Sequence, residues 1–338
     1  MHAAPQLSRV SLPKFLNEDI SRDFPHALAA VASAKTVTLD FSAVEFAYPV
    51  GTLIAGREIR HFVRGRQAQK LLTMVAGIDA TKPAHSFLNF IGFFDFVGIP
   101  NKTKIGTARG GGSYVPIRRY SRDEVVGTQP ADSKSIHNAI VRRAEELADV
   151  LVGCRPESPS YQAVLYSLKE VIRNVFEHSG AQECFVAAQK WSNGLVEVGV
   201  IDEGMGIRAS LRQAIDCADD STAILSAIKP GVSRAMKLDD SRNQHGNSGF
   251  GLYVLSELGR CFGRFTLGSG AAALQIEKGE SRILPASFHG TFVGLKLADS
   301  IYDFGGVLND IVSVGEVDAE AAGITARASR SSRSISLE

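Results

Sequence analysis

The sequence lacks both long apolar runs and an excess of charge of either sign. Its 338 residues hold 37 Lys and Arg against 36 Asp and Glu, so the formal net charge is +1 at pH 7. This balance gives no global reason to expect a nucleic acid or an anionic membrane as partner. No segment approaches the roughly 18–20 apolar residues of a membrane span. A secretory pattern is also absent, because Glu18, Asp19 and Asp23 come early.

Cysteine is scarce. Cys154, Cys184, Cys217 and Cys261 are spaced 30, 33 and 44 residues apart and form no C-x-x-C pair. This spacing argues against a disulfide framework and against a zinc site. It predicts reduced, mostly buried thiols in a cytoplasmic protein.

What is present is ordinary globular usage, with 44% hydrophobic and 22% charged residues. At roughly 100–200 residues per domain, the length favours two domains. The patterning predicts an α/β fold with a module over 1–100, a Gly- and Arg-rich linker over 101–135 and a second domain over 136–300. The linker is expected to hold one short strand near 114–117, and a nucleic-acid-binding patch is the alternative for its basic residues. The stretch over 316–338 becomes Ser- and Arg-rich and is predicted to be a disordered tail.

Hydrophobic periodicity predicts the main elements. The first module is expected to hold a helix over 53–63 and an apolar helix or helix–turn over 87–97, with strands over 36–41 and, buried, over 71–75. In the second domain we expect helices over 136–151 and 161–177, the latter opened by Pro159 after Ser158. Its expected strands cover 184–189, 195–201, 264–267, 274–277 and 291–297.

A polar pair marks the second of those helices. Glu170 and Asn174 are four residues apart and therefore lie on one helix face, with His178 a turn further. A carboxylate and a carboxamide stacked in this way can polarise a nucleophile and hold a hydrated Mg²⁺ beside it. An ordinary polar helix face is the alternative.

A second feature is the stretch VEVGVIDEGMGI, an alternating strand that ends at Asp202 and is followed by Gly204 and Gly206. A carboxylate fixed at a strand end can accept a hydrogen bond from an exocyclic amine, and glycines permit the close approach of a flat ring. A β-turn with Asp as its turn residue is the alternative.

The third feature is the run His245-Gly246-Asn-Ser-Gly249-Phe250-Gly251-Leu252, which leads into a helix. Glycines before a helix N-terminus expose backbone N–H groups and make an anion site. The run is no Walker loop, because GK[ST] occurs nowhere in the chain. Gly290-Thr291, the fourth feature, opens the final strand.

In this order the four features resemble the N, G1, G2 and G3 boxes of the GHKL superfamily, the ATP-binding domains of gyrases, heat-shock chaperones, histidine kinases and MutL proteins. The resemblance covers roughly 136–297. It implies an α/β sandwich that binds ATP and Mg²⁺, with an ATP lid over 207–245. Asp202 would bind adenine N6 and Asn174 the metal. Phosphates and nucleotide would further be held by Gly204, Gly206, Ile207, Gly246, Gly249, Phe250, Gly251, Leu252 and Thr291.

The subclass depends on Glu170. Sensor histidine kinases usually carry Asn at this place, whereas EVIRNVFEHSG is similar to bacterial anti-sigma-factor serine kinases. A Glu here implies a general base that acts on a hydroxyl or on water. His137 as phosphoacceptor is an alternative, and His178 would either polarise a phosphate or cap the helix near Gly180.

The first module resembles STAS domains, the fold of anti-sigma-factor antagonists, over 37–51 followed by a helix. Such domains often carry a Ser or Thr phosphoacceptor just before the glycine. Here Pro49 and Val50 precede Gly51, and Thr52 is the only nearby hydroxyl. A docking or dimerisation module is therefore expected, with any small α/β domain as the alternative.

The expected function is that of an ATP-binding regulatory protein that phosphorylates a partner protein on Ser or Thr. The partner would be a STAS-like or sigma-factor-like regulator, and a homodimer is a further expectation. The alternatives are a conformational ATPase whose lid closure controls partner binding, and a non-catalytic ATP-sensing scaffold.

Overall fold

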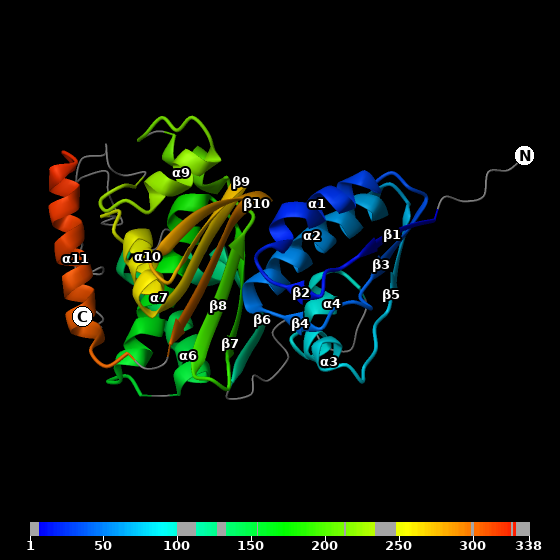
Figure 1. Cartoon of the computed structure of the whole chain (residues 1–338), viewed down its shortest axis with the longest axis horizontal. Coiled ribbons are helices and arrows are strands. Elements are labelled where there is room, and N and C mark those ends of the chain that lie inside the picture. Colours follow the sequence, from blue (N-terminus) through cyan, green and yellow to red (C-terminus); the bar gives the residue numbers. More distant parts are fainter. Residues whose placement is uncertain are drawn as a thin grey trace, which may run out of the picture.

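Two sheets, with helices between and beside them, arrange the chain in layers (Figure 1). The computed structural model describes residues 7–99, 113–126, 133–153, 155–212, 214–233, 248–298, 301–325 and 327–328. Helices and strands alternate along these residues, so the expected α/β class is confirmed. Within the same ranges, none of the helices combines the length and hydrophobicity that a membrane span needs.

The first sheet is parallel and belongs to the N-terminal module. Its strands pair in the order β1 (Leu7–Ser11), β3 (Thr36–Asp40) and β5 (Leu72–Ala76). A short ribbon joins β2 (Phe15–Leu16) to β4 (Phe46–Ala47). The expectation that 71–75 is a buried strand is wrong as to burial, because Leu72 and Met74 are exposed. β5 is an edge strand. The helices of the module cover only one face of this sheet, and the exposed side chains of β5 lie on the opposite face (Figure 1).

Four helices complete the module: α1 (Ile20–Ala30), α2 (Pro49–Ala68), α3 (Pro83–Phe90) and α4 (Phe93–Phe96). The predicted helix over 53–63 is therefore longer, and Pro49 begins it where a missing N–H costs no hydrogen bond. The helix or helix–turn expected over 87–97 is two helices that meet at Gly92.

The second sheet is antiparallel. Its strand order is β6 (Tyr114–Ser121), β7 (Glu183–Lys190), β8 (Leu195–Asp202), β10 (Glu280–Ala298) and β9 (Gly263–Glu277). β9 is one strand where two were expected, because it pairs with β10 along a single long hairpin. The short strand predicted within the linker near 114–117 is confirmed as β6, which continues to Ser121. Its residues Val115 and Ile117 are buried and tie the segment to the sheet.

Helices cover one face of this sheet and continue beyond it. They are α5 (Arg122–Val126), α6 (Ser133–Val152), α7 (Pro159–Asn174), a π-helical turn η1 (Val175–Ser179), α8 (Gly206–Leu211), α9 (Asp220–Ala227), α10 (Gly251–Phe262) and α11 (Phe304–Ala321). Ser158 caps α7 as predicted and accepts a hydrogen bond from the N–H of Tyr161. The tail prediction is wrong for 316–321, which belongs to α11. That helix buries Phe304, Leu308 and Val312 at helical spacing.

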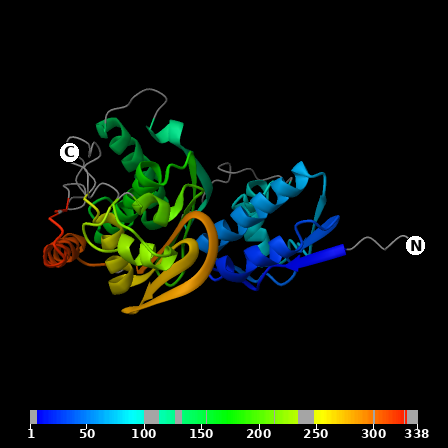
Figure 2. The ribbon, with the colours of Figure 1, turned by 90° about the horizontal axis from the view of Figure 1, so that it is seen from above.

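The second sheet has two buried faces, and β8 shows how they alternate. Val196, Val198 and Val200 belong to the core shared with α6, α7 and α10. Ile201 belongs to the core of the N-terminal module. The module thus packs on the face that the helices of the second domain leave open. Figure 2 shows the two parts side by side, with α11 at the end farthest from the N-terminus.

The N-terminal module packs on a pair of glycines on this face of the sheet. Gly199 of β8 and Gly294 of β10 are cross-strand partners. A Cβ at Gly199 would lie 2.6 Å from the Cα of Val50, and one at Gly294 would lie 3.3 Å from its side chain. Since Val50 is in the first turn of α2, that end of the helix rests directly on the sheet.

The described cysteines carry free thiols, as expected from their spacing. Cys184 and Cys217 are buried, whereas Cys261 is exposed. Cys154 lies outside the described residues.

Candidate functional site

A pocket opens between the sheet, the end of α7 and the start of α10. Its enclosed cavity volume is about 100 Å³. This is smaller than the range of about 300–1,000 Å³ that drug-sized ligands occupy, so a nucleotide would fill the open mouth as well. Most of the predicted site residues line it, namely Asn174, Asp202, Gly206, Ile207, Gly249, Gly251, Leu252 and Thr291. Residues from five separate elements, α7, β8, α8, α10 and β10, therefore meet at one place.

Asp202 ends β8 and points to the face of the sheet that bears the pocket. Its side chain is almost fully buried and accepts a hydrogen bond from the N–H of Gly204 at 2.7 Å. Burial raises the pKa of Asp202 to about 6, against the opposing effect of hydrogen bonds from Gly204, Ser179 and Thr291. The Asp202 carboxyl group is thus a strong hydrogen-bond acceptor that is largely shielded from water.

Asn174 is the last residue of α7, directly before the π-helical turn η1. Turns of this type recur at functional sites because they displace the side chains that follow. Among the described residues, no hydrogen-bond partner is found for the buried Nδ2 of Asn174. A buried amide nitrogen without a partner costs free energy, so this group favours a polar ligand in the pocket.

Glu170 does not line the pocket. It is completely buried, and its Oε2 pairs with Nη2 of Arg173 at 2.7 Å. Arg173 also approaches Glu177 at 3.7 Å and itself lines the pocket. In this conformation, therefore, the guanidinium of Arg173 stands between the pocket and the residue predicted to act as base.

The glycines of the site are required by packing. Gly251 begins α10 against the Glu170 carboxylate, which a Cβ at Gly251 would contact. At Gly249 the backbone has φ +75°, and a Cβ would lie 2.6 Å from the carbonyl carbon of Gly231. The start of α10 is thereby brought against α7 and the segment before the undescribed residues 234–247. Gly246 lies in that segment, outside the described residues.

Gly204 and Phe250 are beside the pocket and do not line it. Gly204 acts through its N–H to Asp202. Phe250 is fully buried, and its ring packs edge-on against Tyr253 at 6.2 Å between centroids. The side chain of Phe250 therefore belongs to the core beneath α10.

A small network fixes the turn after Asp202. The N–H of Ile207 donates to Oγ of Ser269 at 3.0 Å, and that hydroxyl donates to the carbonyl of Gly290 at 2.7 Å. Sequence reasoning missed Ser269, because no local pattern indicates a contact across 62 residues. It also missed Arg173, although its i+3 spacing from Glu170 was visible.

Three further candidate residues have clear places. His178 lines the pocket, whereas His137 on α6 is half-buried and is not among the residues that line it. Burial, with Lys169 and Arg173 nearby, lowers the pKa of His137. Thr52 is fully buried in α2, so its hydroxyl is not accessible as a phosphoacceptor in this conformation.

Whether the pocket can bind the expected Mg²⁺ depends on the side chains near Asn174. Among the described residues there is no group of three or more His, Cys, Asp or Glu that could hold a metal ion. Mg²⁺ commonly takes one or two protein ligands and completes its shell with waters and substrate phosphates. Asn174 with an anionic ligand in the pocket fits that pattern.

Comparisons with known proteins do not identify the chain. No protein-family model matches it, and no curated protein or solved structure matches it significantly.

Proposed function

We propose that the chain is an ATP-binding regulatory protein, with a GHKL-type domain behind a STAS-like N-terminal module. The observation that carries this proposal is the convergence of Asn174, Asp202 and the Gly249–Leu252 turn on one pocket. These are the residues that the resemblance assigns to metal, adenine and phosphates. The antiparallel sheet with α7 and α10 on the same face also agrees with the expected α/β sandwich.

The residues divide the nucleotide between two ends of the pocket. The carboxylate of Asp202 would accept a hydrogen bond from the exocyclic amine of adenine. At the other end, the backbone N–H groups at the start of the 12-residue helix α10 would bind the phosphates, which the helix dipole also favours. Asn174 would hold Mg²⁺, which neutralises phosphate charge when bound.

The proposed reaction is transfer of the γ-phosphoryl group to a Ser or Thr of a partner protein. The hydroxyl oxygen bonds to the γ-phosphorus, the bond from that phosphorus to the β,γ-bridging oxygen breaks, and the hydroxyl proton passes to Glu170. Glu170 reaches that role only after it leaves Arg173. The same ion pair favours the second candidate, an ATPase or a non-catalytic ATP sensor, because the described conformation withholds the base from the pocket.

Two substitutions separate these functions. Glu170→Gln should retain nucleotide binding and abolish turnover, whereas Asp202→Asn should weaken ATP binding about 10–100-fold, the loss of one hydrogen bond to a charged acceptor. Binding is measured by calorimetry, and turnover with γ-labelled ATP, Mg²⁺ and a lysate of the native host. A labelled protein band indicates a kinase, free phosphate alone an ATPase, and neither a sensor.

The matched control is Glu177→Gln, which removes the other carboxylate near Arg173. It should keep both binding and turnover. Tight ATP binding by the Asp202→Asn variant would contradict the adenine assignment. Partner regulation that persisted unchanged in Glu170→Gln would exclude both catalytic functions and leave the sensor.

A further inference from the structure

Two consecutive acidic residues, the last residue of β8 and the one that follows it, point to opposite sides of the sheet. Asp202 faces the pocket. Glu203 faces the N-terminal module, where it contacts Arg57 and Arg60. Because the two residues are consecutive, a shift of the backbone at Glu203 also moves the Asp202 carboxylate. This strand end therefore connects the two halves of the protein mechanically.

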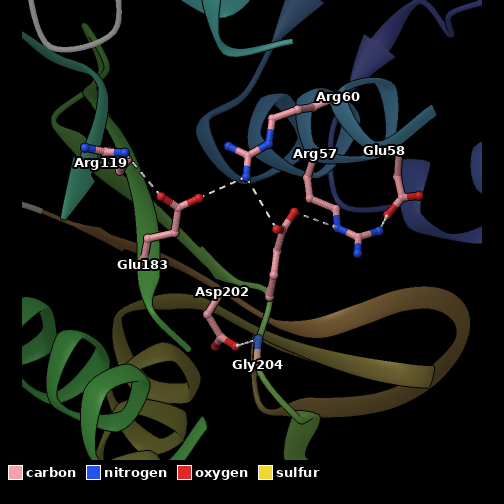
Figure 3. Close-up of polar contacts among 8 residues, drawn as sticks. Arg57, Glu58, Arg60, Arg119, Glu183, Asp202 and Gly204 are labelled. Carbon is pink, nitrogen blue, oxygen red and sulfur yellow. Dashed lines mark hydrogen bonds and ion pairs between the residues drawn. The ribbon is translucent and has the colours of Figure 1, made fainter. Parts of the chain in front are cut away.

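Two arginines of α2 hold Glu203. Nε of Arg57 lies 3.3 Å from its Oε1, and Nη2 of Arg60 lies 3.4 Å from its Oε2. Figure 3 shows both guanidinium groups directed from α2 toward the sheet, which bears Glu183, Asp202 and Gly204. Each carboxylate oxygen thus lies within ion-pair distance of its own arginine; Arg60 also donates a hydrogen bond to Glu203, whereas Nε of Arg57 does not.

The arginines are themselves held rigidly. Arg57 and Arg60 are 6% and 5% exposed, so both charges are removed from water. The guanidinium of Arg60 lies 4.6 Å from the ring centroid of Phe185 and 5.2 Å from that of Phe96. It also contacts Glu183 of β7 at 3.0 Å. One side chain of α2 therefore joins the adjacent ends of β7 and β8.

The connection from α2 through Glu203 continues to the pocket along the backbone. After Glu203 comes Gly204, whose N–H donates to Oδ1 of Asp202 at 2.7 Å. That hydrogen bond sets the direction of the carboxylate, and its donor is one residue from the side chain that α2 grips. The contacts from Arg57 and Arg60 to the candidate nucleotide site are thus continuous.

We propose that α2 of the N-terminal module positions the nucleotide site by gripping Glu203 with Arg57 and Arg60, so that docking of the module and binding of nucleotide are coupled. The proposal rests on the proposed function for the identity of the ligand. Coupling of this kind is reciprocal. A partner that displaces α2 weakens nucleotide binding, and bound nucleotide strengthens docking of the module. Arg57, Arg60 and Glu203 are positioning residues, since none of them lines the pocket.

The first test measures binding of a non-hydrolysable ATP analogue with Mg²⁺ by calorimetry. Glu203→Gln and Arg60→Gln should each weaken binding about 5–150-fold, the usual range of allosteric coupling. The double variant should bind the analogue no more weakly than the single variant with the lower affinity, because both substitutions break the same connection between α2 and Glu203. Unchanged affinity in both single variants, or losses that add fully in the double variant, would overturn the proposal.

Two controls keep general destabilisation apart from positioning. Glu280→Gln removes a carboxylate from an exposed ion pair with Arg282 at the far end of the β9–β10 hairpin. Ile59→Val trims a fully buried side chain in α2 between the two arginines. Both should bind the analogue as the wild type does. Weakening by Ile59→Val equal to that by Arg60→Gln would show that lost stability, not positioning, is measured.

The second test does not require a nucleotide. Backbone hydrogen exchange of peptides covering 202–207 should be at least fivefold faster in Arg60→Gln than in the wild type or in Glu280→Gln. Unchanged exchange there would overturn the inference. A wild-type chain that binds no nucleotide would refute the proposed function alone, because the exchange result still decides whether α2 holds this turn.

Discussion

Asp202 is a carboxyl group whose burial opposes its ionisation. It is 3% exposed, and its pKa of about 6 lies above the ordinary Asp value of 3.8. The folded state therefore binds the proton more tightly than the unfolded state does. The resulting stabilisation is complete below about pH 4 and disappears as the pH rises through 6. At neutral pH the charged form is kept at a cost, as expected for a carboxylate with the ligand-binding role that we propose.

Asp202→Asn should therefore stabilise the protein near neutral pH. The neutral amide can still accept from Gly204, so we expect a gain on the order of 1–3 kcal/mol at pH 7.5 and none at pH 4. Urea unfolding at the two pH values measures the difference. Asp79→Asn is the matched control with the opposite sign, because hydrogen bonds from Thr81 lower the pKa of that exposed carboxyl group. A loss of stability in Asp202→Asn at both pH values would contradict the prediction.

Among the elements, α2 has two different surroundings. Its first turn rests on Gly199 and Gly294, where an added methyl group would meet backbone or side chain. Near its C-terminal end, Gly65 is exposed, and a Cβ there would find no atom within 4 Å. Glycine is thus required on the sheet beneath α2 but only weakens the helix itself.

Two alanine substitutions should consequently have opposite effects on stability. Gly199→Ala forces Val50 away from the sheet and should lower the free energy of unfolding by about 1–3 kcal/mol. Gly65→Ala improves helix propensity and should raise it by about 0.5–1 kcal/mol. Thermal unfolding followed by circular dichroism compares both with the wild type. An unchanged Gly199→Ala would mean that the module is not packed tightly on the sheet.

At the scale of the whole molecule, the two parts share the second sheet, which has a core on each of its faces. The core of the N-terminal module includes Phe185, Ile201 and Phe292 of the second sheet. Removal of the module would expose these side chains to water, which is unfavourable for each of them. The sheet therefore separates two cores, and the core of the N-terminal module is complete only with side chains of the second sheet.

The full chain should accordingly unfold in a single step. Differential scanning calorimetry should record one transition whose calorimetric and van't Hoff enthalpies agree. Nucleotide at 100 times its dissociation constant should shift that transition as a unit, by about 2.7 kcal/mol of added stability. Two separated transitions, of which only one responds to nucleotide, would show that the modules unfold independently.

Local patterns predicted much of this architecture from the sequence. The alternation in 195–201 and the Ser158-Pro159 start of α7 needed only neighbouring residues, and both predictions are confirmed. β6 was predicted only as a short strand near 114–117, because Arg118 and Arg119 mask the remainder, which pairs with β7. The site was located by the order of four motifs, and the structure brings most of those residues to one pocket.

The contacts that regulate the site could not be predicted in this way. Arg173 could turn toward Glu170 or away from it, and only packing around the buried carboxylate decides between them. The grip on Glu203 joins residues more than 140 positions apart, as in the Arg60–Glu203 pair with a separation of 143. Such pairs depend on how two modules dock, and no local periodicity records that.

The alternation of β8 has a consequence for how the chain can change in evolution. Because Asp202 and Glu203 face opposite sides, a one-residue insertion or deletion within this strand would exchange them. The carboxylate of Asp202 would then face Arg57 and Arg60, and the carboxylate of Glu203 would face the pocket. Surface turns such as Lys278-Gly279 can vary in length, whereas β8 should not change its number of residues.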